Sequence, residues 1–220
     1  MTTALVLFPS PVPYAEALRL QDVFVAKRQA DAIPDTLIVL EHTPVITLGI
    51  RAKKEHLLLD PEALARKGIE VHATPRGGDV TYHGPGQLVF YPIIKLEGSE
   101  ADAHAFVEKL EEIAIHTAAE FGVEAYRRKG KTGVWTDAGK IAAIGIRFKK
   151  WVSSHGMSLN VTVGLEGFDA IIPCGLHGEK VTSLKAILGD ACPAIREVRT
   201  ATLRQFERVM NRTLSPPTPD

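Results

Sequence analysis

The chain has 220 residues, of which 45% are hydrophobic and 24% charged, and its 26 lysines and arginines balance 26 aspartates and glutamates. This length suffices for one sizeable core, and the zero net charge argues against a protein that binds nucleic acid through its phosphates. Two cysteines are too few for a disulfide framework or a structural zinc site, so we expect a reducing, cytoplasmic setting. The apolar run at residues 4–8 is too short for a signal peptide or a membrane span, so we expect a soluble protein without membrane contact.

The first part of the chain predicts a long helix, three strands and a short helix. Apolar residues recur at helical spacing over residues 14–30, which indicates a helix with one buried face. Asp60 before Pro61 is typical of a helix start and Gly68 of a helix end, so a short helix is expected over residues 61–67. The strands are expected over residues 36–40, 45–48 and 69–73.

The second part of the chain begins with a glycine-punctuated stretch, Arg76–Gly86, for which we expect a loop that leads into a strand over residues 88–94. Ser99–Asp102 resembles a capping box, which predicts a helix that starts there and ends at Gly122. A closing helix is expected over residues 198–210. Further strands are expected over residues 123–126, 133–136, 140–148 and 158–163, with the second and third joined as a hairpin by a turn at 137–139.

Strands that pair as hairpins with helices between them predict an α/β (α+β) fold with a mixed, largely antiparallel sheet flanked by helices. Nothing in the composition indicates an interdomain linker, so we expect one domain over residues 1–212 and a disordered tail over residues 213–220. Along the strand at 140–148, alternation would place Lys140 on the same face as Ala142 and Ile144.

Cys174 is a candidate nucleophile. It lies between Pro173, which fixes φ, and Gly175, which permits conformations closed to other residues, so its thiol is expected at a sharp bend. Such a bend can hold a thiol at the edge of a pocket, but a buried cysteine acting as a small hydrophobe fits the same residues. Cys192 is interpreted as an ordinary structural thiol.

Lys140 begins a strand that is otherwise rich in isoleucine and alanine. One interpretation is that its ammonium reaches solvent at the strand end, as lysines on such faces usually do. The other is that it faces a thiolate, because a nearby cation lowers the pKa of a cysteine below its usual value of about 8.5. The same lysine, once neutral, could serve as a general base.

The Arg76–Gly86 stretch has neither the Gly-Lys-Ser/Thr of a Walker A loop nor the glycine spacing of a dinucleotide fingerprint. Its glycines would allow the backbone to approach a ligand or an oxyanion closely, although a simple turn with a buried Tyr82 fits equally well. His83 and His155 lie among glycines, and either could pair with a thiol. Because the sequence lacks the spacings of zinc ligands, we predict no metal.

Taken together, several segments resemble the octanoyltransferases, a family also called lipoyl(octanoyl) transferase or lipoate-protein ligase B. They follow one another in the family's order and span roughly residues 30 to 190. The fold that the resemblance implies is similar to that of the biotin/lipoate ligase catalytic domain. The matching segments are Arg76–Leu88, Tyr91–Ile93, Gly133–Trp135, Gly139–Ile146, His155–Val161 and Ile172–Leu176.

The resemblance implies transfer of an octanoyl group from acyl carrier protein to a lysine of lipoyl domains, without a cofactor. The acceptors would be the lipoyl domains of 2-oxoacid dehydrogenase complexes and the glycine cleavage H protein. It implies that Cys174 is the nucleophile and that Lys140 lowers its pKa. The resemblance also implies substrate contacts for Arg76, Gly77, Gly78, Asp79, Val80, Thr81, Tyr82, His83, Ala143, Ile144, Gly145, Gly156, Met157 and Ser158.

Other interpretations remain. An ATP-dependent lipoate– or biotin–protein ligase would share the fold but would need no cysteine nucleophile. A non-catalytic protein that binds lipoyl domains would need neither Cys174 nor Lys140, and a thioesterase would pass the acyl group to water. The basic run at residues 127–131 fits a solvated loop or a surface that docks the acidic acyl carrier protein.

Overall fold

The computed structural model describes residues 1–172 and 178–215, and its strands form two sheets. The predicted nucleophile, Cys174, therefore lies outside the described residues. The larger sheet contains β1 (Thr2–Leu7), β2 (Thr36–Leu40), β6 (Gln87–Ile93), β7 (Tyr126–Arg128), β8 (Lys131–Thr136), β9 (Gly139–Lys149), β10 (Val152–Asn160) and β11 (Thr213–Leu214). The smaller sheet contains β3 (Val45–Leu48), β4 (Glu70–Ala73) and β5 (Val80–His83).

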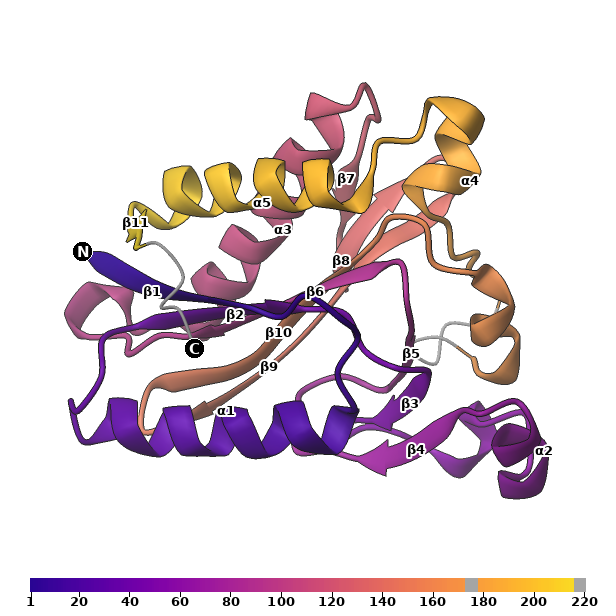
Figure 1. Ribbon diagram of the computed structural model, residues 1–220, viewed down its shortest axis with the longest axis horizontal. Coiled ribbons are helices and arrows are strands. Elements are labelled where there is room, and N and C mark those ends of the chain that lie inside the picture. The colour runs from indigo at the N-terminus through magenta and orange to yellow at the C-terminus, as the bar shows by residue number, and fades with distance from the viewer. Residues whose placement is uncertain (173–177, 216–220) are drawn as a thin grey trace.

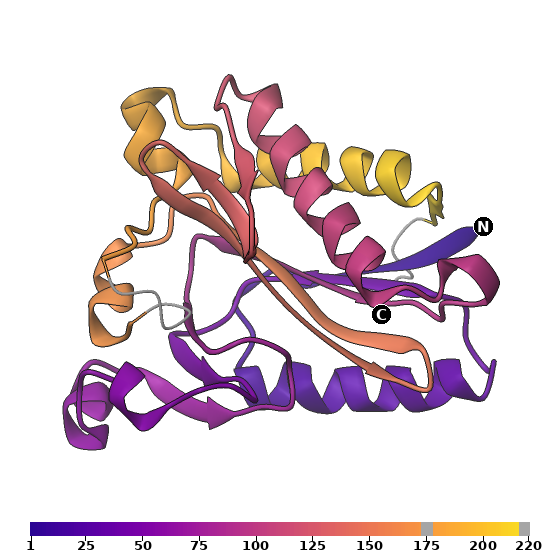
Figure 2. The same ribbon diagram turned by 180° about the vertical axis from the view of Figure 1, so that it is seen from behind.

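The helices lie on both faces of the larger sheet. In Figure 1, α3 and α5 lie above this sheet and α1 lies below it, and the view from behind in Figure 2 shows the same layers. The smaller sheet and α2 lie beside one end of α1. The helices are α1 (Tyr14–Gln29), α2 (Pro61–Arg66), α3 (Ala103–Glu120), α4 (Leu184–Leu188) and α5 (Ile195–Met210).

The strand order of the larger sheet is β11-β1-β2-β6-β10-β9-β8-β7. Antiparallel pairs run without interruption from β2 to β7, while β1 pairs in parallel with both β2 and β11. The smaller sheet has the order β4-β3-β5, with one parallel and one antiparallel pair. This arrangement confirms the predicted α/β fold with a mixed, largely antiparallel sheet.

The continuous apolar sequence of β2 is explained by burial on both faces of the sheet. Leu37 and Val39 point into the core under α3 and α5, whereas Ile38 and Leu40 point into the core against α1. Successive strand residues face opposite sides, so a strand covered on both sides has no position for a polar residue between its ends. A third apolar cluster joins the smaller sheet to α2 and to residues 163–171.

Several expected boundaries need correction. The capping box predicted at Ser99–Asp102 is wrong, because the Asp102 carboxylate alone caps α3 by accepting from the backbone N–H groups of His104 and Ala105. The predicted strand at 123–126 is replaced by β7, which begins only at Tyr126. The strand expected from Ser158 begins earlier, at Val152, and the glycine-punctuated loop contains β5.

The prediction that the disordered tail starts at residue 213 is also wrong, because residues 213–215 are ordered. Thr213 and Leu214 form β11 and pair with Thr2 and Thr3 of β1, and the Ser215 N–H donates to the Thr3 carbonyl. These contacts hold the chain after α5 against the edge of the larger sheet. Residues 216–220 lie outside the described part.

Within residues 1–172 and 178–215, none of the helices has the length and apolar character needed to cross a membrane.

Candidate active site

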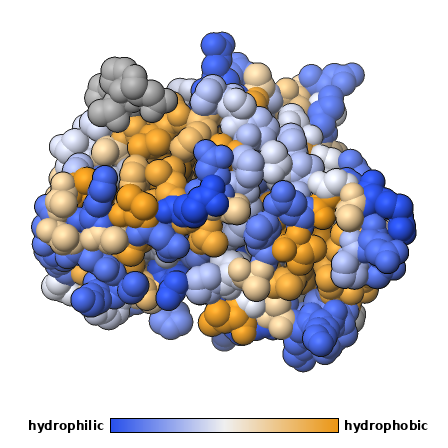
Figure 3. Space-filling model, turned by 60° about the horizontal axis from the view of Figure 1, so that its bottom comes forward, coloured by the Kyte–Doolittle hydropathy of each residue, from blue (hydrophilic) through white to orange (hydrophobic). Residues whose placement is uncertain are grey.

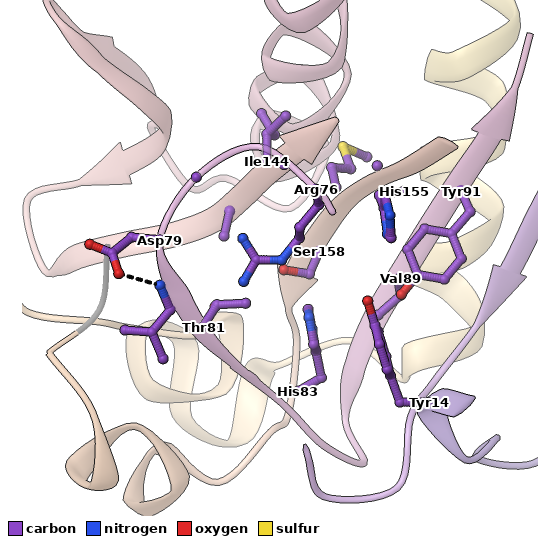
Figure 4. A pocket seen from close by; sticks show the side chains of 16 residues that line it. Tyr14, Arg76, Asp79, Thr81, His83, Val89, Tyr91, Ile144, His155 and Ser158 are labelled. Atoms are coloured by element: carbon purple, nitrogen blue, oxygen red, sulfur yellow. Dashed lines mark hydrogen bonds between the residues drawn. The ribbon is translucent and has the colours of Figure 1, made fainter. Parts of the chain in front are cut away.

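A cavity lies where the smaller sheet meets β9 and β10 of the larger one (Figure 4). Most of the residues expected to contact substrate line it, from three separate parts of the chain. Figure 4 shows Tyr14, Tyr91, His83 and His155 gathered on one side of the Arg76 side chain. The lining residues are Tyr14, Arg76, Gly78, Asp79, Val80, Thr81, His83, Val89, Tyr91, Ala143, Ile144, Gly145, His155, Gly156, Met157 and Ser158.

Arg76 is buried and fastens the segment before β5 to β3. Its Nε donates to Thr47 Oγ1 at 3.2 Å and its Nη2 donates to the Thr47 carbonyl at 2.6 Å, while Nη1 donates to the Gly77 carbonyl at 3.0 Å. Three donors of one planar guanidinium thus hold neighbouring carbonyl and hydroxyl oxygens in fixed positions. Arg76 therefore shapes the rim of the cavity as well as lining it.

Glycines around Arg76 are needed for close packing. A β-carbon at Gly145 would lie 2.7 Å from the Gly77 carbonyl oxygen, and one at Gly49 would lie 2.5 Å from the Gly78 carbonyl oxygen. The Gly77 N–H already donates to the Ile146 carbonyl at 2.9 Å, so it does not point at a bound oxyanion. The Gly77 N–H is therefore engaged within the protein.

His83 and His155 are both buried and both held neutral. Burial is the main cause that lowers the pKa of each to about 3, and nearby cationic groups add to it, Arg76 among them in both cases. His83 Nδ1 lies 2.6 Å from Gln87 Oε1, and the His155 ring meets the Tyr91 ring edge-on. At neutral pH these rings can form hydrogen bonds but carry no charge.

Tyr82 is the substrate-contact candidate that turns away from this cavity. Its ring packs edge-on against Phe168, with the ring centroids 5.3 Å apart, and it belongs to the apolar cluster of the smaller sheet. Residues alternate along β5, so Thr81 and His83 face the cavity while Tyr82 faces the other side. The interpretation of Tyr82 as a buried turn residue fits its packing, although it lies on a strand. Gly77 is also absent from the lining.

Lys140 does not share a face with Ala142, contrary to the expectation from simple alternation. Trp135 of β8 pairs with Lys140 and Val134 pairs with Ala142, so Ile141 is an extra residue in β9. Such a bulge places two consecutive residues on one side, and both Ile141 and Ala142 lie in the core. Lys140 is thereby brought to the side of Ala143, which lines the cavity.

Lys140 is only 6% exposed, which excludes the interpretation of a lysine that reaches solvent at the strand end. Its Nζ donates to the Thr132 carbonyl at 3.1 Å and lies 4.9 Å from the centre of the Trp135 ring. Both the carbonyl oxygen and the ring face attract an ammonium. Lys140 lines a second, smaller cavity that shares Thr81, Ala143 and Ser158 with the first one.

The described residues on either side of 173–177 are anchored near this site. The Ile172 N–H donates to the His56 carbonyl at 2.8 Å. On the other side, the Lys140 N–H donates to the Lys180 carbonyl and the Lys140 carbonyl accepts from the Thr182 N–H. The chain that leads away from residues 173–177 is therefore paired directly with the strand that carries Lys140.

A contact between His56 and Asp79 was not foreseen from the sequence. His56 Nδ1 lies 2.8 Å from Asp79 Oδ2, and Asp79 Oδ1 accepts from the Val80 N–H at 2.7 Å. The side chain of His56 thus contacts the cavity rim, and its backbone carbonyl accepts a hydrogen bond from Ile172. Because the two residues are far apart in sequence and His56 has no glycine-rich surroundings, no local pattern indicated the pair. Tyr14, Val89 and Tyr91 were likewise not foreseen as lining residues.

The basic run at residues 127–131 is not a solvated loop. Arg127 pairs with Glu111 and Glu112 of α3, while Arg128 and Lys131 both pair with Glu179. Arg128 belongs to β7 and Lys131 to β8, so three charges of the run are neutralised within the protein.

Cys192 packs against the main core, and burial raises the pKa of its thiol. In the described part of the chain, no three or more His, Cys, Asp or Glu side chains gather in a way that could hold a metal ion.

The family model described as "Lipoyl protein ligase A/B catalytic domain" matches residues 13–207. An octanoyltransferase of Acidobacterium capsulatum is 44% identical over 212 residues, which cover 90% of this chain and 86% of that protein. An octanoyltransferase of Caldicellulosiruptor saccharolyticus is 49% identical over 180 residues, covering 81% and 77% of the two chains.

Solved structures show the same fold at low sequence identity. The structure of lipoate-protein ligase A bound with ATP matches with a TM-score of 0.78 at 16% identity. The match covers 100% of this chain and 90% of that chain. The bi-partite lipoate protein ligase of Thermoplasma acidophilum has a TM-score of 0.74 at 16% identity, with coverage of 87% and 100%.

The fold and the family model together define a catalytic domain of the lipoyl protein ligase class. Within that class, the chain belongs to the octanoyltransferase family, and it is an acyltransferase.

Proposed function

We propose that this acyltransferase moves an octanoyl group from octanoyl-acyl carrier protein to a lysine of a lipoyl domain through a thioester on Cys174. The observation that carries the proposal is the placement of Lys140. Its side chain is buried beside the cavity, and its backbone N–H and carbonyl are hydrogen-bonded to the chain that follows residues 173–177. A buried cation is the means by which a protein lowers the pKa of a neighbouring thiol.

In the first step, the Cys174 thiolate attacks the carbonyl carbon of the carrier-bound thioester. The carbon–sulfur bond to the carrier breaks, and the carrier leaves as a thiol after taking the proton of Lys140, which is then neutral. One thioester replaces another, so the step needs no outside source of energy. The proton that Cys174 loses is held by Lys140 or by solvent, and Lys140 in its charged form stabilises the thiolate.

In the second step, a lysine of the acceptor attacks the acyl-cysteine. This amine must be neutral to act as a nucleophile, and Lys140 is the nearby group that can accept its proton once the thiolate has been consumed. The products are an octanoyl amide on the acceptor and free Cys174. The proposed acceptors are the lipoyl domains of 2-oxoacid dehydrogenase complexes and the glycine cleavage H protein.

The lining of the cavity supports an acyl substrate. Val89, Ala143, Ile144 and Met157 provide apolar surface for a hydrocarbon chain, and the neutral histidines add no charge that would have to be desolvated. Arg76, Thr81 and Ser158 supply polar groups in the same lining, where a carbonyl or amide of the donor could bind. Apolar walls with few polar groups are typical of small-molecule sites.

The proposal is tested by intact-protein mass measurement after mixing with octanoyl-acyl carrier protein. Wild type is expected to gain one octanoyl group and to lose it to an added lipoyl domain. Cys174→Ala should gain none, while the matched control Cys192→Ala should behave as wild type. Lys140→Ala should acylate slowly at neutral pH and recover at higher pH, where the thiol ionises without help.

Two outcomes would contradict the proposal. If wild type gains no octanoyl group, and the lipoyl domain is modified only with ATP and free octanoic acid, the chain is a ligase. If the acyl-cysteine forms but passes its octanoyl group only to water, the chain is a thioesterase.

A further inference from the structure

The segment Ile50–Lys54 leads into a short 3-10 turn, Lys54–His56. It forms an exposed surface of apolar and basic side chains beside the active-site cavity. Ile50 is 72% exposed, and the side chains of Arg51, Lys53 and Lys54 are exposed around it. Among the residues that the structure describes, these three basic side chains make no ion pair. One acidic residue, Glu55, directly follows the segment.

A groove of about 770 Å³ runs along this surface. Its walls combine apolar residues with the two lysines of the segment. On the face shown in Figure 3, apolar side chains gather among charged ones at the right, over the part of the chain that contains the smaller sheet and α2. The residues of the groove that matter here are Leu48, Ile50, Leu57, Pro75, Lys53 and Lys54.

The surface is joined directly to the rim of the cavity. The N–H groups of Gly49, Ile50 and Arg51 donate to the carbonyls of Asp79, Arg76 and Gly78, at 3.1, 3.1 and 3.0 Å. These are three of the four residues of the segment 76–79, and all three line the cavity but not the groove. A partner seated in the groove would therefore contact Gly49 and Ile50, which are hydrogen-bonded to the segment that lines the active site.

We propose that the surface of Ile50, Arg51, Lys53 and Lys54 docks the acidic protein that carries the acyl donor. The inference rests on the proposed function and deepens it by assigning the donor a place to bind. The unpaired basic side chains complement an acidic partner, and the exposed isoleucine supplies apolar area at the centre of the contact. By contrast, three basic residues of the 127–131 run are occupied by Glu111, Glu112 and Glu179.

The position of the groove favours the donor over the acceptor. The groove and the cavity share no lining residue, so a partner docked in the groove must reach past the segment 76–79 to place its reacting group in the cavity. A carrier protein bears its thioester at the end of a long flexible arm, which can span that separation. An acceptor lysine is a short side chain, so its protein must dock at the mouth of the cavity itself.

The test compares Lys53→Glu/Lys54→Glu with wild type, using octanoyl-acyl carrier protein and octanoyl-pantetheine as alternative donors. The KM for the carrier-bound donor should rise about tenfold at low ionic strength, and the difference should shrink as salt screens the charges. Transfer from octanoyl-pantetheine should stay unchanged, because this small donor needs no docking surface. Ile50→Ser should raise the KM for the carrier-bound donor several-fold with little salt dependence.

The matched control is Arg196→Glu/Arg199→Glu, which makes the same change in charge on α5, in the layer above the larger sheet (Figure 1). This control should leave the KM for both donors unchanged. Affinity for the carrier protein without an acyl group, measured by fluorescence anisotropy, checks docking independently of the chemistry. It should fall for Lys53→Glu/Lys54→Glu and not for the control.

Several results would overturn the inference. An unchanged KM and affinity for the carrier would show that it docks elsewhere, and an equal loss with both donors would show damage to the cavity. A raised KM for the lipoyl domain alone would assign the surface to the acceptor. Transfer from neither donor by wild type would instead refute the proposed function, and the docking inference with it.

Discussion

Gly133 and Lys140 lie against each other across the β8–β9 hairpin, and the lysine occupies the space that a side chain at position 133 would need. A β-carbon on Gly133 would lie 2.5 Å from Lys140 Cε and 3.0 Å from Nζ. Gly133 also has a φ of +131°, which L residues with a side chain rarely adopt. The position of the ammonium thus depends on a neighbour that has no side chain.

Gly133→Ala should therefore displace Lys140 as well as strain the backbone. We expect a loss of roughly 1–3 kcal/mol in unfolding free energy. If Lys140 lowers the pKa of Cys174, the pH profile of thiol alkylation should also shift to higher pH, as measured with iodoacetamide in wild type and variant.

The control for this substitution is Gly130→Ala in the neighbouring turn between β7 and β8. Gly130 also has a left-handed φ, +76°, but a β-carbon there would meet nothing within 4 Å. It should lose stability without a shift in the alkylation profile. An unshifted profile for Gly133→Ala would mean that the ammonium adapts without loss of function.

The buried histidines predict acid sensitivity. Burial is the main cause that lowers the pKa of His83 and His155 to about 3, against 6.5 for an ordinary histidine. Between these values the unfolded chain binds protons that the folded one does not, so stability falls as pH falls from about 6.5 toward 3. Each neutral histidine should contribute a slope of about 1.4 kcal/mol per pH unit in this window.

Urea unfolding at pH 7, 6 and 5 measures this slope. His155→Gln should reduce this slope by about 1.4 kcal/mol per pH unit, which corresponds to one proton, because glutamine retains hydrogen-bonding groups but does not titrate. His104→Gln, at an exposed position, is the control and should leave the slope as in wild type. A slope that is the same in His155→Gln and wild type would show that His155 titrates normally.

The contact of His56 with Asp79 should matter for binding of the donor. Asp79→Ala removes both the contact with His56 and the acceptor for the Val80 N–H, so segment 76–79 loses two of its fixed points. We expect a loss of roughly 1–3 kcal/mol in stability and a several-fold rise in KM for the acyl donor.

Asp79→Asn provides the comparison, because its amide oxygen can still accept from the Val80 N–H. It should restore most of the stability that Asp79→Ala loses. Steady-state kinetics and chemical denaturation of both variants measure these effects. A KM at the wild-type value in Asp79→Ala would contradict the prediction.

The start of α3 offers a test that involves stability alone. Asp102→Ala should cost about 1 kcal/mol, since two backbone N–H groups at the helix start lose their acceptor. Ser99→Ala should have no effect, because Ser99 belongs to a separate 3-10 turn. Thermal unfolding of both variants decides which residue is the cap, and equal losses would favour the capping box.

Local signals in the sequence were sufficient for much of the fold. The apolar run at 36–40, the Asp60-Pro61 helix start and the helix that contains Phe106 and Leu110 follow from local chemistry, and the structure confirms them. The β5 strand was missed because its glycine-rich flanks indicate a turn, whereas its residues are held by pairing with β3, which is distant in sequence.

The same limit applies to the candidate site. The motifs indicated Arg76, His83 and Ala143, which the structure brings to one cavity. The contact between His56 and Asp79 depends on tertiary packing, and alternation alone could not show that an extra residue in β9 reverses the face of Lys140. Sequence periodicity locates a strand, but the register with its neighbours decides which way each side chain points.

The bulge at Ile141 has a consequence for how the length of this hairpin can vary. Lys140 is placed by its pairing with Trp135 and Lys180, while the remainder of β9 is placed by β10. A relative that lacked one residue at position 141 would have a regular hairpin and would keep its lysine on the cavity side. Loss of a residue between Ala143 and Ile146 would instead turn the side chains that line the cavity toward the core. We therefore expect that aligned relatives can lack a residue at position 141 but not within 143–146.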